Sequence, residues 1–168
     1  MSQMTPSILR ESLLHAERVK KSDVMSFASA SDIDSSGVIY SLLLDRSFVR
    51  KIEPELNVDE VQDFLRIYFK RCIVADPQST WADSRYSACW DVANWLLRMQ
   101  DSNELSDGAL LLWKSWLESI YIEGDADVRK ALETALLEHI FINRTLFRAF
   151  SSWENAPQLK EAYEACSP

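Results

Sequence analysis

The predicted fold depends on residues 80–100, TWADSRYSACWDVANWLLRMQ, which have the spacing of a helix that is apolar around most of its circumference. The polar side chains recur at steps of three and four, so they form one narrow stripe made up of Ser84, Ser87, Asp91, Asn94 and Arg98. The other residues between Tyr86 and Met99 are apolar. Because a helix of this kind is enclosed by its neighbours, we expect it at the centre of the molecule.

The stripe on this helix is the first candidate site. Asp91, Asn94 and Arg98 predict either a small polar pocket or an internal hydrogen-bonded network that joins the central helix to its neighbours. In a pocket, Asp91 is the candidate base and Arg98 the candidate group for holding an anionic substrate. A network of paired side chains would instead have a structural role.

Further helices are predicted on both sides of this stretch by the same three- and four-residue spacing. Thr5 and Asn57 are expected N-caps, and short connections between consecutive helices indicate antiparallel neighbours. We therefore predict an all-α fold of about seven helices, arranged as bundle-like antiparallel hairpins in a single domain over residues 1–168. The predicted ranges are 6–21, 37–52, 58–74, 80–100, 107–122, 125–142, 144–152 and 157–165.

Composition excludes several classes of protein. With 168 residues, 47% of them apolar, and only 3 Gly, the chain is neither a disordered segment nor a protein of strands and tight turns. Its net charge of −8 argues against a nucleic-acid partner, which requires a basic surface. We expect no signal peptide, because residues 1–6 lack a basic start followed by an apolar run, and the sequence has no apolar stretch of the ~18 residues that a membrane span needs. We therefore expect a cytoplasmic protein with no membrane partner.

Two stretches resemble known proteins. Residues 125–132, DADVRKAL, followed by Ala135-Leu136-Leu137, resemble the start of the second helix of a HEAT-type repeat. This resemblance over 125–142 implies a short HEAT-like stack of helical hairpins, as an alternative to a bundle, and implies no chemistry. The tail from Leu136 to Leu159 is similar to the C-termini of uncharacterised bacterial proteins, a likeness that implies no activity.

A calcium-binding loop is suggested by residues 32–39, DIDSSGVI, which have oxygen ligands at the first, third and fifth positions and Gly37 at the sixth. The bidentate acid required at position 12 is replaced by Leu43. We therefore interpret the cluster as the cap of a helix that begins near Gly37. The two histidines, His15 and His139, lie in no metal-ligand motif, so no catalytic residue, metal or cofactor is predicted.

Acidic side chains are gathered in runs without basic neighbours. The second half of the chain, from residue 85, has 8 basic and 13 acidic residues. Its runs are ordinary acids at helix ends or a face that attracts a basic protein partner. The candidate partner-binding residues are Asp101, Glu104, Asp107, Glu118, Glu123, Asp125, Asp127 and Trp153.

Trp153 belongs to this set because it lies in the polar segment Ser151–Asn155, where we expect it to be exposed, as we do for Trp81. Three functional hypotheses follow. The first is a non-enzymatic acidic binding domain, most specifically a bacterial immunity-type inhibitor of a basic toxin. The alternatives are a small helical enzyme that uses the Asp91, Asn94 and Arg98 stripe, and a scaffold or oligomer subunit. The sequence does not predict an oligomeric state.

Overall fold

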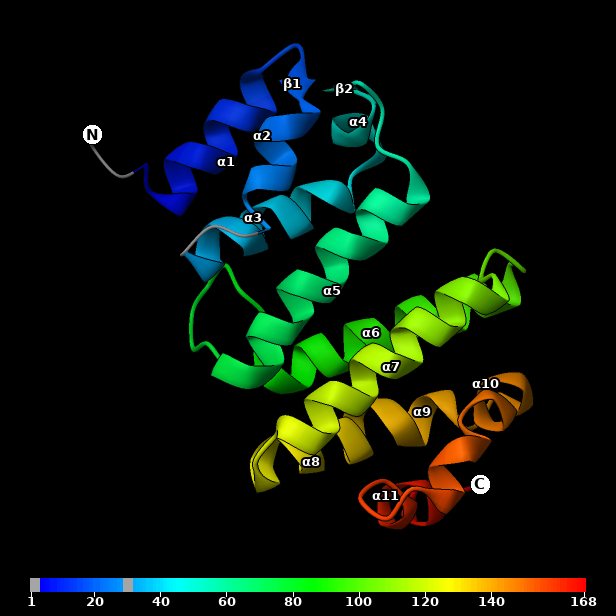
Figure 1. Ribbon diagram of the computed structural model, residues 1–168. Helices are drawn as coiled ribbons and strands as arrows, with labels where there is room; N and C mark the ends of the chain where they lie inside the picture. Colours follow the sequence, from blue (N-terminus) through cyan, green and yellow to red (C-terminus); the bar gives the residue numbers. More distant parts are fainter. Residues whose placement is uncertain (1–3, 29–31) are drawn as a thin grey trace. The chain divides into compact units, whose positions relative to one another are not determined.

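The chain is described by a computed structural model over residues 4–28 and 32–168 (Figure 1). Helices dominate this part of the chain, and the strands found there are two residues long. The predicted all-α class is confirmed. The number of helices, about seven, and the hairpin arrangement are not confirmed, because several predicted helices are divided into shorter ones.

Two compact units make up the chain, Met1–Ser84 and Arg85–Pro168. Each is described by itself, and the single domain over residues 1–168 stays a prediction. None of the helices in the described ranges is long and apolar enough to cross a membrane.

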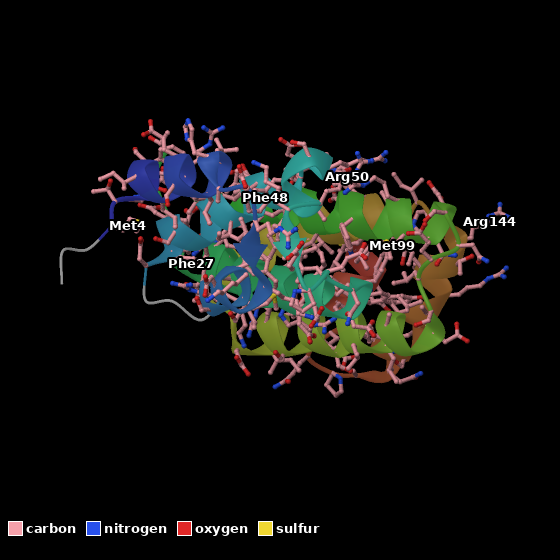
Figure 2. The ribbon with its side chains drawn as sticks, turned by 90° about the horizontal axis from the view of Figure 1, so that it is seen from above. Met4, Phe27, Phe48, Arg50, Met99 and Arg144 are labelled. Carbon is pink, nitrogen blue, oxygen red and sulfur yellow. The ribbon has the colours of Figure 1, made fainter. Side chains whose placement is uncertain are left out.

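The first unit is built around helix α3, which packs against α1, α4 and α5. Val19 of β1 lies opposite Ile52 of β2 in a short parallel pair. Figure 2 labels Phe48, which is buried, and Arg50, which is exposed. The elements of this unit are α1 (Pro6–His15), β1 (Val19–Lys20), α2 (Lys21–Ser26), α3 (Ile33–Leu43), α4 (Arg46–Val49), β2 (Ile52–Glu53) and α5 (Val58–Ala75).

Two predicted helix starts in this unit are confirmed by their caps. The Thr5 side chain accepts a hydrogen bond from the Ile8 amide at the start of α1. Asn57 and Glu60 form a reciprocal capping box at the start of α5, with both bonds at 2.9 Å. The helix predicted over 58–74 is therefore observed as Val58–Ala75, one residue longer at its C-terminal end. The helix predicted over 6–21 ends at His15, six residues early.

The segment with calcium-loop spacing forms the first turns of α3. The Asp32 side chain caps the helix by accepting hydrogen bonds from the amides of Asp34 and Ser35. This confirms a capping role, but the helix begins at Ile33 and not near Gly37. Gly37 lies against the loop that ends this unit: a Cβ atom there would be 2.0 Å from the Trp81 carbonyl oxygen. Only glycine fits this close approach without displacing the backbone.

The second unit contains α6, whose buried side chains pack against the helical segment from α8 to α9. Helix α7 packs against α8, and α11 packs against the short helix η2. The elements are α6 (Arg85–Asp101), α7 (Asp107–Glu123), α8 (Ala126–Leu132), the π-helical segment η1 (Glu133–Leu137), α9 (Glu138–Ile140), α10 (Arg144–Ala149), the 3-10 helix η2 (Ser151–Asn155) and α11 (Lys160–Ala165).

The prediction that residues 80–100 form an enclosed helix is only partly correct. Helix α6 begins at Arg85, and its buried face is formed by Ala88, Cys89, Val92, Ala93, Leu96 and Met99. Its other face is open, with the aromatic side chains of Tyr86 and Trp90 each 44% exposed. The His139 ring stacks on Trp90, with ring centroids 3.8 Å apart, and covers part of that side chain. The helix is therefore covered on one face and open on the other, and aromatic residues occupy part of the open face.

Candidate functional site

The polar stripe of α6 lies at the surface of its unit. Asn94 and Arg98 are exposed, and Asp91 is half-buried. The Arg98 guanidinium lies 5.7 Å from the centroid of the Trp95 ring, a cation–π distance. The predicted internal network is therefore wrong, because two of its three members face outward. No structural observation favours Asp91 as a base, so the enzyme hypothesis stays a prediction.

The acidic candidates of the second unit fall into two groups at opposite ends of α7. Asp101, Glu104 and Asp107 lie around its first turn, and Glu123, Asp125 and Asp127 lie around its last turn and the start of α8. A helix of 17 residues at a rise of 1.5 Å per residue separates these ends by about 24 Å. The structure thus places these six acids in two groups, one at each end of α7.

Some of these acids stabilise helix starts. The Asp125 side chain accepts a hydrogen bond from the Val128 amide at 2.9 Å, and Asp127 lies in the first turn of α8. Asp107 lies in the first turn of α7, where a negative charge interacts favourably with the helix dipole. The expectation of acids at helix ends is confirmed for Asp107, Asp125 and Asp127. All three side chains are exposed.

Trp153 and Glu118 do not form an outward binding pair. Trp153 is 1% exposed, and its indole Nε1 donates a hydrogen bond of 2.7 Å to Glu118 Oε1. The predicted exposure of Trp153 is wrong because the short helix η2 turns the indole inward, against the rings of Tyr121 and Phe150. Glu118 is half-buried and holds this indole, so its carboxylate has an internal role. Trp81, the other tryptophan expected to be exposed, is half-buried.

Two acidic side chains of the first unit have basic partners. Glu53 pairs with Arg18 at 3.0 Å and Glu60 with Lys21 at 2.8 Å. The hydrogen bond from Lys21 is the largest cause of a lowered pKa at Glu60. By contrast, no described Lys or Arg lies within ion-pair distance of Asp101, Glu104 or Asp107. The negative charge at the start of α7 is therefore available to a partner.

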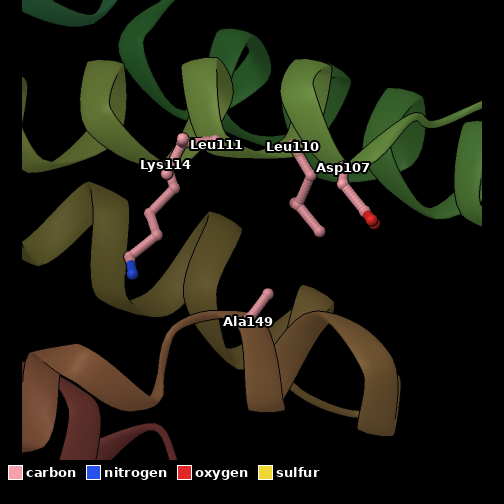
Figure 3. A pocket seen from close by; sticks show the side chains of 5 residues that line it. All are labelled: Asp107, Leu110, Leu111, Lys114 and Ala149. Carbon is pink, nitrogen blue, oxygen red and sulfur yellow. The ribbon is translucent and has the colours of Figure 1, made fainter.

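A groove lies beside these acids, between α7 and α10 (Figure 3). It has a volume of about 200 Å³. The close-up shows the Leu110 side chain and Ala149 directed toward one another across the groove, while Asp107 lies at one end and Lys114 at the other. The Lys114 ammonium donates a hydrogen bond to Ser152 Oγ. The lining residues are Asp107, Leu110, Leu111, Lys114 and Ala149.

Of these lining residues, only Asp107 was a candidate site residue predicted from the sequence. A signal for the others was present in the three consecutive leucines 110–112. Successive residues on a helix are about 100° apart, so three in a row extend beyond a single buried stripe. Leu111 is 61% exposed and Leu112 is 57% exposed, as this spacing requires.

The three cysteines provide no nucleophile. Cys72, Cys89 and Cys166 are free and buried. Burial raises the pKa of each of these thiols to about 12. Since the thiolate is the reactive form, these side chains are poorly reactive at neutral pH.

Thiol labelling tests this description. At pH 8 we expect a disulfide-exchange reagent to leave all three cysteines of the native protein unmodified. After denaturation in urea, all three should react, at rates at least about 10²-fold higher. Rapid labelling of any one cysteine in the native protein would show that its side chain is accessible and would contradict the burial.

Comparison with known proteins found no family model that matches this chain, and no curated protein or solved structure matches it.

Proposed function

We propose that this chain is a non-enzymatic cytoplasmic domain that binds a basic protein partner through α7 and its flanking loops. Residues 101–127, called here the α7 region, carry seven Asp and Glu but one basic residue, Lys114. The observation that carries the proposal is the combination of unpaired acids at the start of α7 with Leu111 and Leu112 exposed on the same helix. Exposed apolar groups supply affinity, and the acids supply attraction and orientation.

The most specific form of the proposal is an immunity-type inhibitor of a basic bacterial toxin. It is supported by the concentration of acid in the α7 region, because a tight inhibitor of a basic enzyme gains its association rate from opposite charge. A short HEAT-like stack or a bundle of helical hairpins is the architecture that we propose for presenting this region.

Neutralising the start of the α7 region tests the binding proposal. We expect the variant Asp101→Asn, Glu104→Gln, Asp107→Asn to capture about tenfold less of a basic partner from the native cell than the unmodified chain. High salt should reduce capture by the unmodified chain and affect the variant less, because salt screens the charges that were removed. Quantitative mass spectrometry of the captured proteins measures both effects.

A charge-matched control separates local from general electrostatics. The variant Glu11→Gln, Glu17→Gln, Glu55→Gln removes three exposed acids from the first unit and should capture the partner as the unmodified chain does. Equal loss in both variants, or a captured protein without excess basic residues, would contradict the proposed site.

The immunity proposal has its own test. Expression of the captured protein alone should arrest growth, and co-expression of this chain should restore it. A captured partner that is not toxic would remove the immunity role and leave the binding role in place.

A further inference from the structure

The groove between α7 and α10 has the dimensions of a side-chain site. Its volume of about 200 Å³ is below the roughly 300–1,000 Å³ of typical small-molecule sites. Its apolar wall includes Leu111, which is 61% exposed on α7. The exposed Ser115 follows one turn later and offers little steric bulk to an approaching chain. A small depression with an exposed leucine at its wall suits a side chain of another protein.

The secondary structure of the walls favours a helix as the occupant. Leu110 and Lys114 lie within α7, where main-chain groups are hydrogen-bonded along the helix; the Leu110 amide, for example, donates to the Ser106 carbonyl oxygen at 2.9 Å. An extended segment laid across these walls would find no main-chain partners for its own N–H and C=O groups. A helix satisfies these groups internally and presents apolar side chains at three- and four-residue spacing to the groove.

Charge selects a basic helix over a second copy of this chain. The α7 region has seven acids and one Lys, so pairing it with itself would bring like charges together. Asp107 lies at one end of the groove and is exposed, so it can receive a Lys or Arg from the occupant. The other wall, α10, carries the exposed Arg144 and Arg148. The occupant should therefore place its basic edge along α7 and not along α10.

We propose that the α7–α10 groove binds an amphipathic basic helix of the partner protein. Its apolar side chains would lie against Leu110, Leu111 and Ala149, and one of its basic side chains would pair with Asp107. This inference rests on the proposed binding function and names the chemistry and conformation of the segment that is bound.

The experiment uses a designed peptide as the probe. It is a synthetic 18-residue helix with leucines at three- and four-residue spacing on one face and lysines on the other. The control peptide has the same composition with its leucines redistributed around the helix. We expect the amphipathic peptide to bind at least about tenfold more tightly in titration calorimetry. It should also shift backbone amide resonances of α7 and α10 in the full chain. Equal affinities, no binding, or shifts confined to other elements would overturn the proposal.

Matched variants separate the apolar contribution from the charge. Leu111→Gln should weaken peptide binding at least about tenfold. Leu44→Gln, which changes a leucine of similar exposure in the first unit, should not. Asp107→Lys should weaken binding, Arg148→Glu should not weaken it, and Glu11→Lys should have little effect. Unchanged binding by the leucine variant would overturn the proposal.

Two further outcomes distinguish this inference from the proposed function. If capture of the native partner requires the acids but not Leu111, the binding function stands and the groove proposal fails. If the peptide binds the groove but no basic partner is captured, the groove proposal stands and the proposed binding function fails. Concentration-dependent dimerisation that the leucine variant abolishes would identify a second copy as the occupant and would also overturn the proposal.

Discussion

Replacing Trp153 with alanine is expected to lower the free energy of unfolding of the second unit by about 3–5 kcal/mol, the range for truncating a fully buried aromatic residue. The side chain is 1% exposed and lies 5.0 Å from the Phe150 ring, between centroids. Its removal would leave a cavity. It would also remove the indole N–H that donates a hydrogen bond to the Glu118 carboxylate. Urea unfolding followed by far-ultraviolet circular dichroism measures the loss.

Two milder variants separate packing from hydrogen bonding. Trp153→Phe keeps an aromatic ring and loses the indole donor, so its effect should be smaller than that of Trp153→Ala. Glu118→Gln keeps an acceptor for Trp153 Nε1 and should cost least, about 1 kcal/mol. If Trp153→Ala left stability unchanged and reduced partner capture, Trp153 would be an exposed binding residue, as the sequence suggested, and the observed burial would be wrong.

Substitution of Gly37 by alanine should produce the second large effect, in the first unit. The added Cβ would lie 2.0 Å from the Trp81 carbonyl oxygen and 2.7 Å from its carbonyl carbon, and these are backbone atoms that cannot rotate away. The loop is also held to α3 by the hydrogen bond from Ser79 Oγ to Asp34 Oδ1, at 2.6 Å. We expect a loss of about 1–3 kcal/mol, as for an overpacked core.

Gly108 provides the matched control for Gly37. It lies in α7 with no atom within 4 Å of an added Cβ. Gly108→Ala should therefore stabilise the chain by about 0.5–1 kcal/mol, because alanine favours a helix. Hydrogen exchange should show faster opening of α3 in Gly37→Ala and no such change in Gly108→Ala. Equal stability of the two alanine variants would contradict the close approach of α3 and the loop.

The helix starts were the most predictable part of the fold. Asn57, Ser106 and Asp125 cap helices as their residue types indicate, because a cap depends on a few adjacent residues. The breaks within predicted helices were not predictable. The stretch 125–142 contains the π-helical segment Glu133–Leu137, in which Glu133 receives the Tyr121 hydroxyl from a separate helix at 2.6 Å. Contacts of this kind depend on the neighbouring element and leave no mark in the local spacing.

The candidate site was predicted in part. Asp101, Glu104 and Asp107 were correctly identified as acids without basic neighbours in the sequence, and the structure also leaves them without ion pairs among the described residues. Asp91, Asn94 and Arg98 were correctly placed on one stripe, but the side of α6 that is covered could not be read from that stripe. The apolar residues of α6 include Tyr86 and Trp90. A hydrophobic pattern counts both as core residues, although each is 44% exposed.

By itself, the sequence determined the all-α class, the positions of most helix starts and the excess of acid around α7, because each of these depends on composition or on neighbours within a few residues. Only the tertiary structure decided that Trp153 is buried against Glu118, 35 positions away, and that Asp107 shares a groove with Ala149. Such pairings depend on how the helices of the unit pack, which brings together side chains that local periodicity cannot relate.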